Sequence, residues 1–115
     1  MTPFYPLALA ALILLASACT PQEQNVGLDT KPIKLSVELD AIYQRSCKNC
    51  HEVEATGAPL LGDKTRWSEI LDKGMDTVLD RAMSGYQGMP PFGQCFECSP
   101  EQIEALIMYM SNPEK

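Results

Sequence analysis

The sequence has little of what many functions require. His51 is its only histidine, and no internal repeat is visible beyond two pairs of closely spaced cysteines. No segment alternates apolar and polar residues at period two, the pattern of a half-buried strand. No paired carboxylates and no nucleophile with a nearby base stand out as an active site. These absences favour an all-α protein that is not an enzyme.

An apolar run at residues 4–18 is shorter than the about 20 residues that cross a bilayer. No Lys or Arg precedes Lys31, but small residues and Cys19 follow the run, as expected of a secretory signal with its cleavage site. Residues 16–19, "ASAC", are similar to a lipobox, in which the cysteine is lipidated and becomes the mature N-terminus. We therefore expect a signal peptide over 1–18, export to the periplasm and a lipid anchor at Cys19 on a bacterial membrane. An ordinary cut after Ala18 is the alternative.

The net charge of −6 is unchanged by removal of residues 1–18, which carry no charged side chain. This charge disfavours nucleic acid and anionic membrane surfaces, and it suits a protein partner with a basic docking patch. Residues 19–35 are polar and rich in proline, so we read them as the lipidated N-terminus and a flexible linker. Membrane association would then run through the lipid, leaving residues 36–115 as one domain. A core this small is expected to need a disulfide, metal or cofactor.

Four helices are expected in this domain, which gives an all-α fold. Ser36 can cap the first, which delivers residues 46–51 at its end. The second begins near Thr65, Asp76 can cap the third, and Ser99 with Pro100 starts the fourth. Glycine and proline interrupt residues 52–63 and 86–98, which we predict to be loops.

Residues 46–51 read "SCKNCH", and C-x-x-C-H is a haem c attachment signal. Each thiol adds across one vinyl group, and the two-residue gap lets Cys47 and Cys50 reach both sides of one porphyrin edge. His51 then lies under the ring with one imidazole nitrogen facing the iron. Its other nitrogen must donate a hydrogen bond to an oxygen that fixes the ring. The motif predicts one covalently bound haem c.

A haem that only transfers electrons needs a sixth iron ligand, and the chain has no second histidine. A methionine thioether is the natural choice, and His/Met ligation raises the reduction potential. Met89 lies in "GMPP", where two prolines stiffen an extended segment. The other methionines after the signal lie at a helix start or on helix faces: Met75, Met83, Met108 and Met110. We therefore predict Met89 as the axial ligand. The apolar wall around the haem is expected from Leu60, Leu61, Trp67, Val78 and Leu79.

Six stretches, "SCKNCH", "GAPLLGD", the lone Trp67, "GMDTVL", "MPPFGQCFECS" and "ALIMYM", together resemble a class I cytochrome c, in particular the short bacterial cytochrome c5 branch. The resemblance covers about residues 39–110. It implies the cytochrome c fold, with haem c on Cys47 and Cys50 and with His51 and Met89 axial.

The same resemblance implies that the Pro59 carbonyl orients His51, and that Cys95 and Cys98 form a disulfide after the methionine segment. Two positions depart from the family pattern. Ile70 stands where the family often has an arginine, so Arg66 is our alternative for a haem propionate. Gly93-Gln94 stands where a Gly-Gly is frequent.

The sequence thus predicts a periplasmic one-electron carrier, with an electron-delivery subunit of a larger haem-linked enzyme complex as the alternative. A four-cysteine zinc module is disfavoured because 44 residues separate the pairs, whereas zinc ribbons have about 15–20. An oxidising compartment also disfavours free thiolates. A thiol–disulfide oxidoreductase would need a βαβ context, which the sequence lacks.

Overall fold

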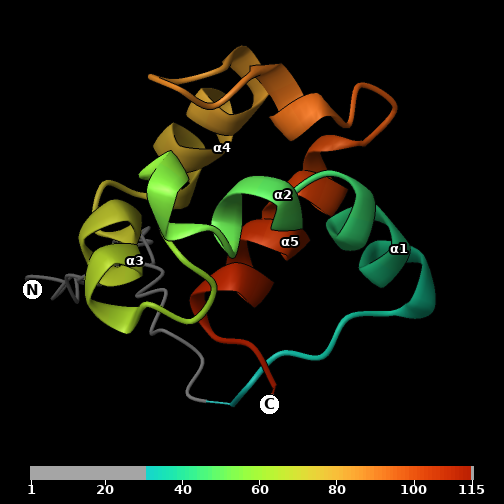
Figure 1. Ribbon diagram of the computed structural model, residues 1–115, viewed down its shortest axis with the longest axis horizontal. Coiled ribbons are helices and arrows are strands. Elements are labelled where there is room, and N and C mark those ends of the chain that lie inside the picture. Colours follow the sequence, from blue (N-terminus) through green and yellow to red (C-terminus); the bar gives the residue numbers. More distant parts are fainter. Residues whose placement is uncertain (1–30, 115) are drawn as a thin grey trace, which may run out of the picture.

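The computed structural model describes residues 31–114 (Figure 1). The predicted signal peptide, Cys19 and most of the linker lie outside the described residues. Five α-helices and two 3-10 helices follow one another: α1 (Val37–Arg45), α2 (Lys48–His51), η1 (Glu54–Thr56), α3 (Lys64–Leu71), α4 (Met75–Ser84), η2 (Pro91–Gln94) and α5 (Pro100–Ser111). Only two isolated bridges, and no strand, occur in residues 31–114, so the predicted all-α class is confirmed.

Helix α5 runs through the middle of the molecule and contacts α1, α3 and α4 (Figure 1). It begins with the predicted capping box, in which Gln102 N donates to Ser99 Oγ at 3.3 Å and Ser99 N donates to Gln102 Oε1 at 2.9 Å. Its buried side chains form one side of the core: Ile103, Leu106, Ile107 and Met110. The helix therefore provides the apolar surface against which the other helices pack.

Two of the expected helix boundaries are wrong. The C-x-x-C-H motif does not continue α1, which ends at Arg45 with Ser46 as its C-cap, but forms the separate helix α2; the Ser46 amide makes the last bond of α1, to Ile42 O at 3.0 Å. Helix α4 is capped by Gly74 rather than Asp76, since the Val78 amide already donates to Gly74 O at 3.2 Å. Asp76 lies instead in the first turn, where its charge faces the positive end of the helix.

The two predicted loops contain short 3-10 helices, η1 and η2. Inside η2, Phe92 and Gly93 have φ of 56°, so this segment departs from regular helix as its glycine and prolines suggested. Ile33, which we assigned to the linker, pairs with the residues after α5: its amide donates to Asn112 O at 2.8 Å, and its carbonyl accepts from Glu114 N at 2.9 Å. None of the helices in residues 31–114 has the length and apolarity of a membrane span.

Candidate haem site

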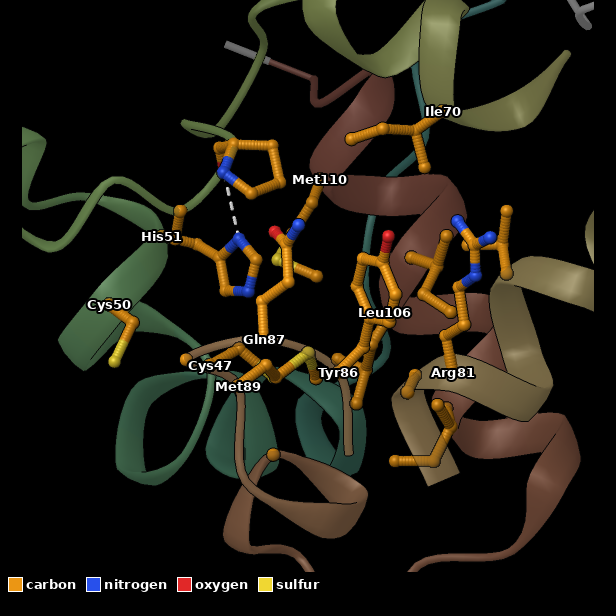
Figure 2. Close-up of a pocket in the computed structure, with 18 of the residues that line it drawn as sticks. Cys47, Cys50, His51, Ile70, Arg81, Tyr86, Gln87, Met89, Leu106 and Met110 are labelled. Atoms are coloured by element: carbon orange, nitrogen blue, oxygen red, sulfur yellow. Dashed lines mark hydrogen bonds between the residues drawn. The ribbon is translucent and has the colours of Figure 1, made fainter. Parts of the chain in front are cut away.

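A cavity of about 740 Å³ lies between α2, α3, α4 and α5 and is bordered by the loop after α4. Its lining includes both cysteines of the C-x-x-C-H motif, His51 and Met89 (Figure 2). The predicted apolar wall is only partly correct. Trp67 and Val78 line the cavity, but the three leucines at 60, 61 and 79 do not. Helix α5 supplies the missing wall through four of its buried residues, Ile103, Leu106, Ile107 and Met110.

Helix α2 brings the motif residues to one side of the cavity (Figure 2). Cys47 is its N-terminal flanking residue and His51 its last residue, and the His51 amide donates to Cys47 O at 3.0 Å. Residues three and four apart share a helix face, so this single turn gathers two thiols and an imidazole. Both thiols are free, with Cys50 exposed and Cys47 partly buried. This is the donor arrangement that a covalent haem requires.

The His51 ring is fixed by one hydrogen bond, 2.7 Å long, between its Nδ1 and the Pro59 carbonyl (Figure 2). A carbonyl only accepts, so Nδ1 carries the proton and Nε2 keeps a free lone pair. Burial lowers the pKa of His51, and the hydrogen bond to Pro59 only partly opposes this. The side chain is therefore a neutral imidazole with one nitrogen available for a metal, as ligation requires.

Burial also raises the pKa of Cys47 to about 11, against a smaller opposing effect of backbone hydrogen bonding and Arg45. A thiol of this kind stays protonated at neutral pH, unlike the low-pKa cysteines of thiol–disulfide enzymes. The four-cysteine zinc site is not assembled either. Residues 31–114 contain no group of three or more His, Cys, Asp or Glu that could hold a metal ion, and Cys95 and Cys98 are bonded to each other.

Met89 belongs to the segment between α4 and η2, residues 85–90, which we call the methionine loop. Its amide donates to Tyr86 O at 2.9 Å, and its carbonyl accepts from Tyr86 N at 3.1 Å. The side chain is half-buried and lines the cavity together with His51. A thioether and an imidazole from separate elements thus line the same cavity, while their predicted role as axial ligands stays a prediction.

The Cys95–Cys98 disulfide follows the methionine loop, and its Cα atoms lie 5.4 Å apart. Both cysteines are buried in the core. An ion pair between Arg45 of α1 and Glu97 covers this turn, and Arg45 Nη2 lies 3.8 Å from Cys95 Sγ. The disulfide joins the end of η2 to the start of α5, the position that the resemblance implied.

Arg66, our expected propionate partner, is exposed and donates from Nη2 to Gly57 O at 2.7 Å. It borders the cavity, as does Ile70 one turn later on α3. Sequence reasoning missed a third side chain, the half-buried Arg81 of α4, which also lines the cavity. A signal for it existed: Arg81 is three residues after Val78, and i,i+3 residues share a helix face.

A protein-family model described as "Cytochrome C oxidase, cbb3-type, subunit III" matches residues 37–110. Cytochrome c5 of Ectopseudomonas mendocina is 39% identical over 74 residues, which are 63% of this chain and 85% of that protein. Cytochrome c5 of Azotobacter vinelandii is 35% identical over 74 residues, covering 63% of this chain and 89% of that protein.

One solved structure is also similar, a chain in "Crystal structure of electron transfer complex of nitrite reductase with cytochrome c". It has a TM-score of 0.59 and 31% sequence identity, covering 68% of this chain and 95% of that chain. The matched segment of the family model, residues 37–110, runs from the start of α1 almost to the end of α5 and includes the helices that enclose the cavity.

Proposed function

Because the chain belongs to the class I c-type cytochromes, we propose that it carries single electrons in the periplasm through one haem c with His51 and Met89 as axial ligands. The family, together with the Cys47 and Cys50 pair, confirms the prediction of one covalently bound haem c. Haem electron transfer needs no substrate site, because the cofactor supplies a one-electron couple when bound.

The residues of this chain would hold and tune that cofactor. Cys47 and Cys50 provide the thioether sulfurs, and the Pro59 carbonyl keeps the His51 imidazole in one tautomer and orientation. The apolar wall excludes water, which together with a methionine ligand favours a high reduction potential. The observation that carries the proposal is the 2.7 Å His51–Pro59 hydrogen bond, which leaves Nε2 free in a cavity that Met89 also lines.

The location and the partners are proposed from the sequence. Residues 1–18 would be the signal peptide, and residues 19–35 would tether the domain, residues 36–115, to a membrane through a lipid on Cys19. The net charge of −6 supports a redox partner with a basic docking patch. A cytochrome c in complex with nitrite reductase, similar to this chain in fold, supports a protein as the partner.

An optical spectrum of the purified protein, made in a host that attaches haem c, tests the proposal. We expect a sharp α-band in the reduced form and a weak near-infrared sulfur–iron band in the oxidised form. A colourless, iron-free polypeptide would overturn the haem assignment. An α-band without the near-infrared band would reject Met89 as ligand and leave the electron carrier in place.

A second candidate function is electron delivery within a larger enzyme complex. The description of the matching family model, a subunit of a cytochrome c oxidase, favours it. Extraction of native membranes in mild detergent, followed by size-exclusion chromatography with haem detection, separates the two functions. A free carrier elutes near the size of the single chain with its detergent micelle, whereas a delivery subunit elutes with its enzyme.

A further inference from the structure

The cations that border the cavity differ in burial and in their partners. Arg66 of α3 and Lys73, two residues after that helix, are exposed, whereas Arg81 of α4 is half-buried. The two exposed cations already donate to backbone carbonyls, Arg66 to that of Gly57 at 2.7 Å and Lys73 to that of Glu69 at 2.8 Å. Arg81 therefore differs from both in lying deeper in the wall of the cavity.

Arg81 has no carboxylate partner in the part of the chain that the structure describes, where the only ion pair joins Arg45 and Glu97. A guanidinium in a partly dry wall is costly unless it meets an anion. Its observed contact is with an aromatic ring: the guanidinium carbon lies 4.4 Å from the centroid of Tyr86. This cation–π contact holds the group in place but leaves its hydrogen-bond donors free for another ligand.

The position of Arg81 indicates which part of a haem it would meet. Cys47 and Cys50 lie on one side of the cavity, whereas Arg81 extends along the opposite side, where Ile70 also lies (Figure 2). In a porphyrin of the haem type, the two propionates are carried on the edge opposite the two vinyl-bearing positions. A haem attached through Cys47 and Cys50 would thus direct its carboxylates toward the side of Arg81.

We propose that Arg81 binds a propionate of the attached haem, and that Tyr86 positions its guanidinium for this contact. This proposal rests on the proposed function, because it requires a bound haem. It replaces our expectation that Arg66 serves this role. The same turn that presents Met89 also presents Tyr86, so the methionine loop would support the iron ligand and the carboxylate partner together.

Other titratable groups border the same cavity and bear on any pH-dependent measurement. They are Arg66 and Glu69 on α3, Lys73 just after α3, and Tyr86 in the methionine loop; Cys47, Cys50 and His51 also line the cavity, but in the holoprotein they would be the two thioethers and an iron ligand. The one acidic residue among them, Glu69, is exposed on α3, and Arg66 and Lys73 are exposed as well. An arginine beside a propionate keeps it ionised over a wide pH range by charge attraction and hydrogen bonding.

The test is the midpoint potential of the holoprotein, measured by spectroelectrochemistry between about pH 5 and pH 9. In the wild type, we expect little pH dependence from the propionate, because it stays ionised. In Arg81→Gln, the propionate loses its cationic partner and therefore binds a proton at higher pH than in the wild type. Its deprotonation then adds a negative charge that favours ferric iron, so the potential falls as pH rises and lies below the wild-type value at the alkaline end.

Arg45→Gln is the matched control, because it removes the same charge outside the cavity lining. Its pH profile should follow the wild type, whereas an Arg81→Gln profile identical to the wild type would overturn the proposal. If Arg81→Gln yields too little holoprotein, Arg81→Lys and Tyr86→Leu decide. In each of these two variants the midpoint potential should fall as pH rises, but less steeply than expected for Arg81→Gln. If both variants instead follow the wild-type pH profile, the proposal is overturned.

The spectra keep this test distinct from that of the proposed function. A wild-type protein without an α-band fails the proposed function and gives no titration. A wild type with both expected bands, combined with unchanged profiles in the Arg81 variants, fails only the propionate assignment.

Discussion

Tyr86 and Met89 bind each other through two backbone hydrogen bonds, 3.1 Å from Tyr86 N to Met89 O and 2.9 Å from Met89 N to Tyr86 O. Gln87, inside this turn, has a φ of 53°, so the chain reverses tightly before the two prolines. A methionine on a freely moving loop would lose conformational entropy on binding iron. The closed turn has already ordered the backbone of Met89, which suits a side chain that must stay in one place.

Replacing Met89 tests this arrangement directly. Met89→Ala or Met89→His should lower the midpoint potential by on the order of 0.1 V, since axial ligands set haem potentials over a range of about 0.8 V. A thioether favours ferrous iron more than imidazole or water does. Redox titration of the holoprotein measures the change, and Met83→Leu, a half-buried methionine outside the cavity lining, is the control. An unchanged potential in both Met89 variants would refute the ligand assignment.

Gly93 offers a more sensitive test of the methionine position. A Cβ built at Gly93 would lie 3.2 Å from Met89 Cε, and the residue has a φ of +56°. Gly57 has a similar φ of +71°, but a Cβ there meets nothing within 4 Å. Gly93→Ala and Gly57→Ala should each cost about 1–2 kcal/mol of unfolding free energy through backbone strain.

Only Gly93→Ala should also weaken the near-infrared sulfur–iron band, because only its new methyl group presses on Met89. Denaturant unfolding and the oxidised spectrum of the two variants measure both effects. Equal bands in the two variants would show that Met89 does not depend on the Gly93 contact.

The Cys95–Cys98 disulfide closes a very short loop, so its contribution to stability should be small. The loop-entropy relation gives about 2 kcal/mol for a loop of this size. Cys95→Ala/Cys98→Ala should lower the unfolding free energy by roughly this amount in denaturant titrations. Alanine is chosen because both sites are buried and a serine hydroxyl would add an unpaired polar group.

The control is Phe96→Ala, in the same turn but 70% exposed, which should change the unfolding free energy little. A larger loss for Phe96→Ala than for the double variant would contradict this account.

Features encoded by neighbouring residues were predictable from the sequence. The capping box of Ser99 and Gln102 is local, since its bonds join residues three apart. The C-x-x-C-H motif is also local, and one helical turn suffices to gather it. The Asp76 cap was a local prediction that failed, because Gly74 with its φ of 86° accepts the first helical bond two residues earlier.

Features that depend on how helices pack were not predictable in the same way. The leucines at 60, 61 and 79 are apolar and close in sequence to cavity residues, yet α5 forms the wall because it crosses the centre of the fold. Arg81 lies on the same helix face as Val78, but its role also depends on the turn that brings Tyr86 under its guanidinium. The roles of His51 and Met89 as iron ligands stay predictions, which the spectra above test.

Trp67 connects the histidine side of the cavity to α3, and its replacement gives the last prediction. Its Nε1 donates to Leu60 O at 2.8 Å, one residue after the carbonyl that accepts from His51. The indole is 3% exposed, and its ring centroid lies 5.8 Å from that of His51. Trp67→Phe should lower the unfolding free energy of the holoprotein by about 2 kcal/mol or more, because it leaves a carbonyl unpaired and a small cavity.

The same variant should loosen the loop that holds the Pro59 carbonyl, and so weaken the hydrogen bond that orients His51. A ligand histidine with a weaker Nδ1 hydrogen bond is a poorer electron donor, so the midpoint potential should rise slightly. Tyr109→Phe is the control, because it removes a polar atom from a partly buried aromatic ring outside the cavity lining. It should stay within about 0.5 kcal/mol of the wild type. If Trp67→Phe is as stable as Tyr109→Phe, the Trp67–Leu60 bond does not hold this loop.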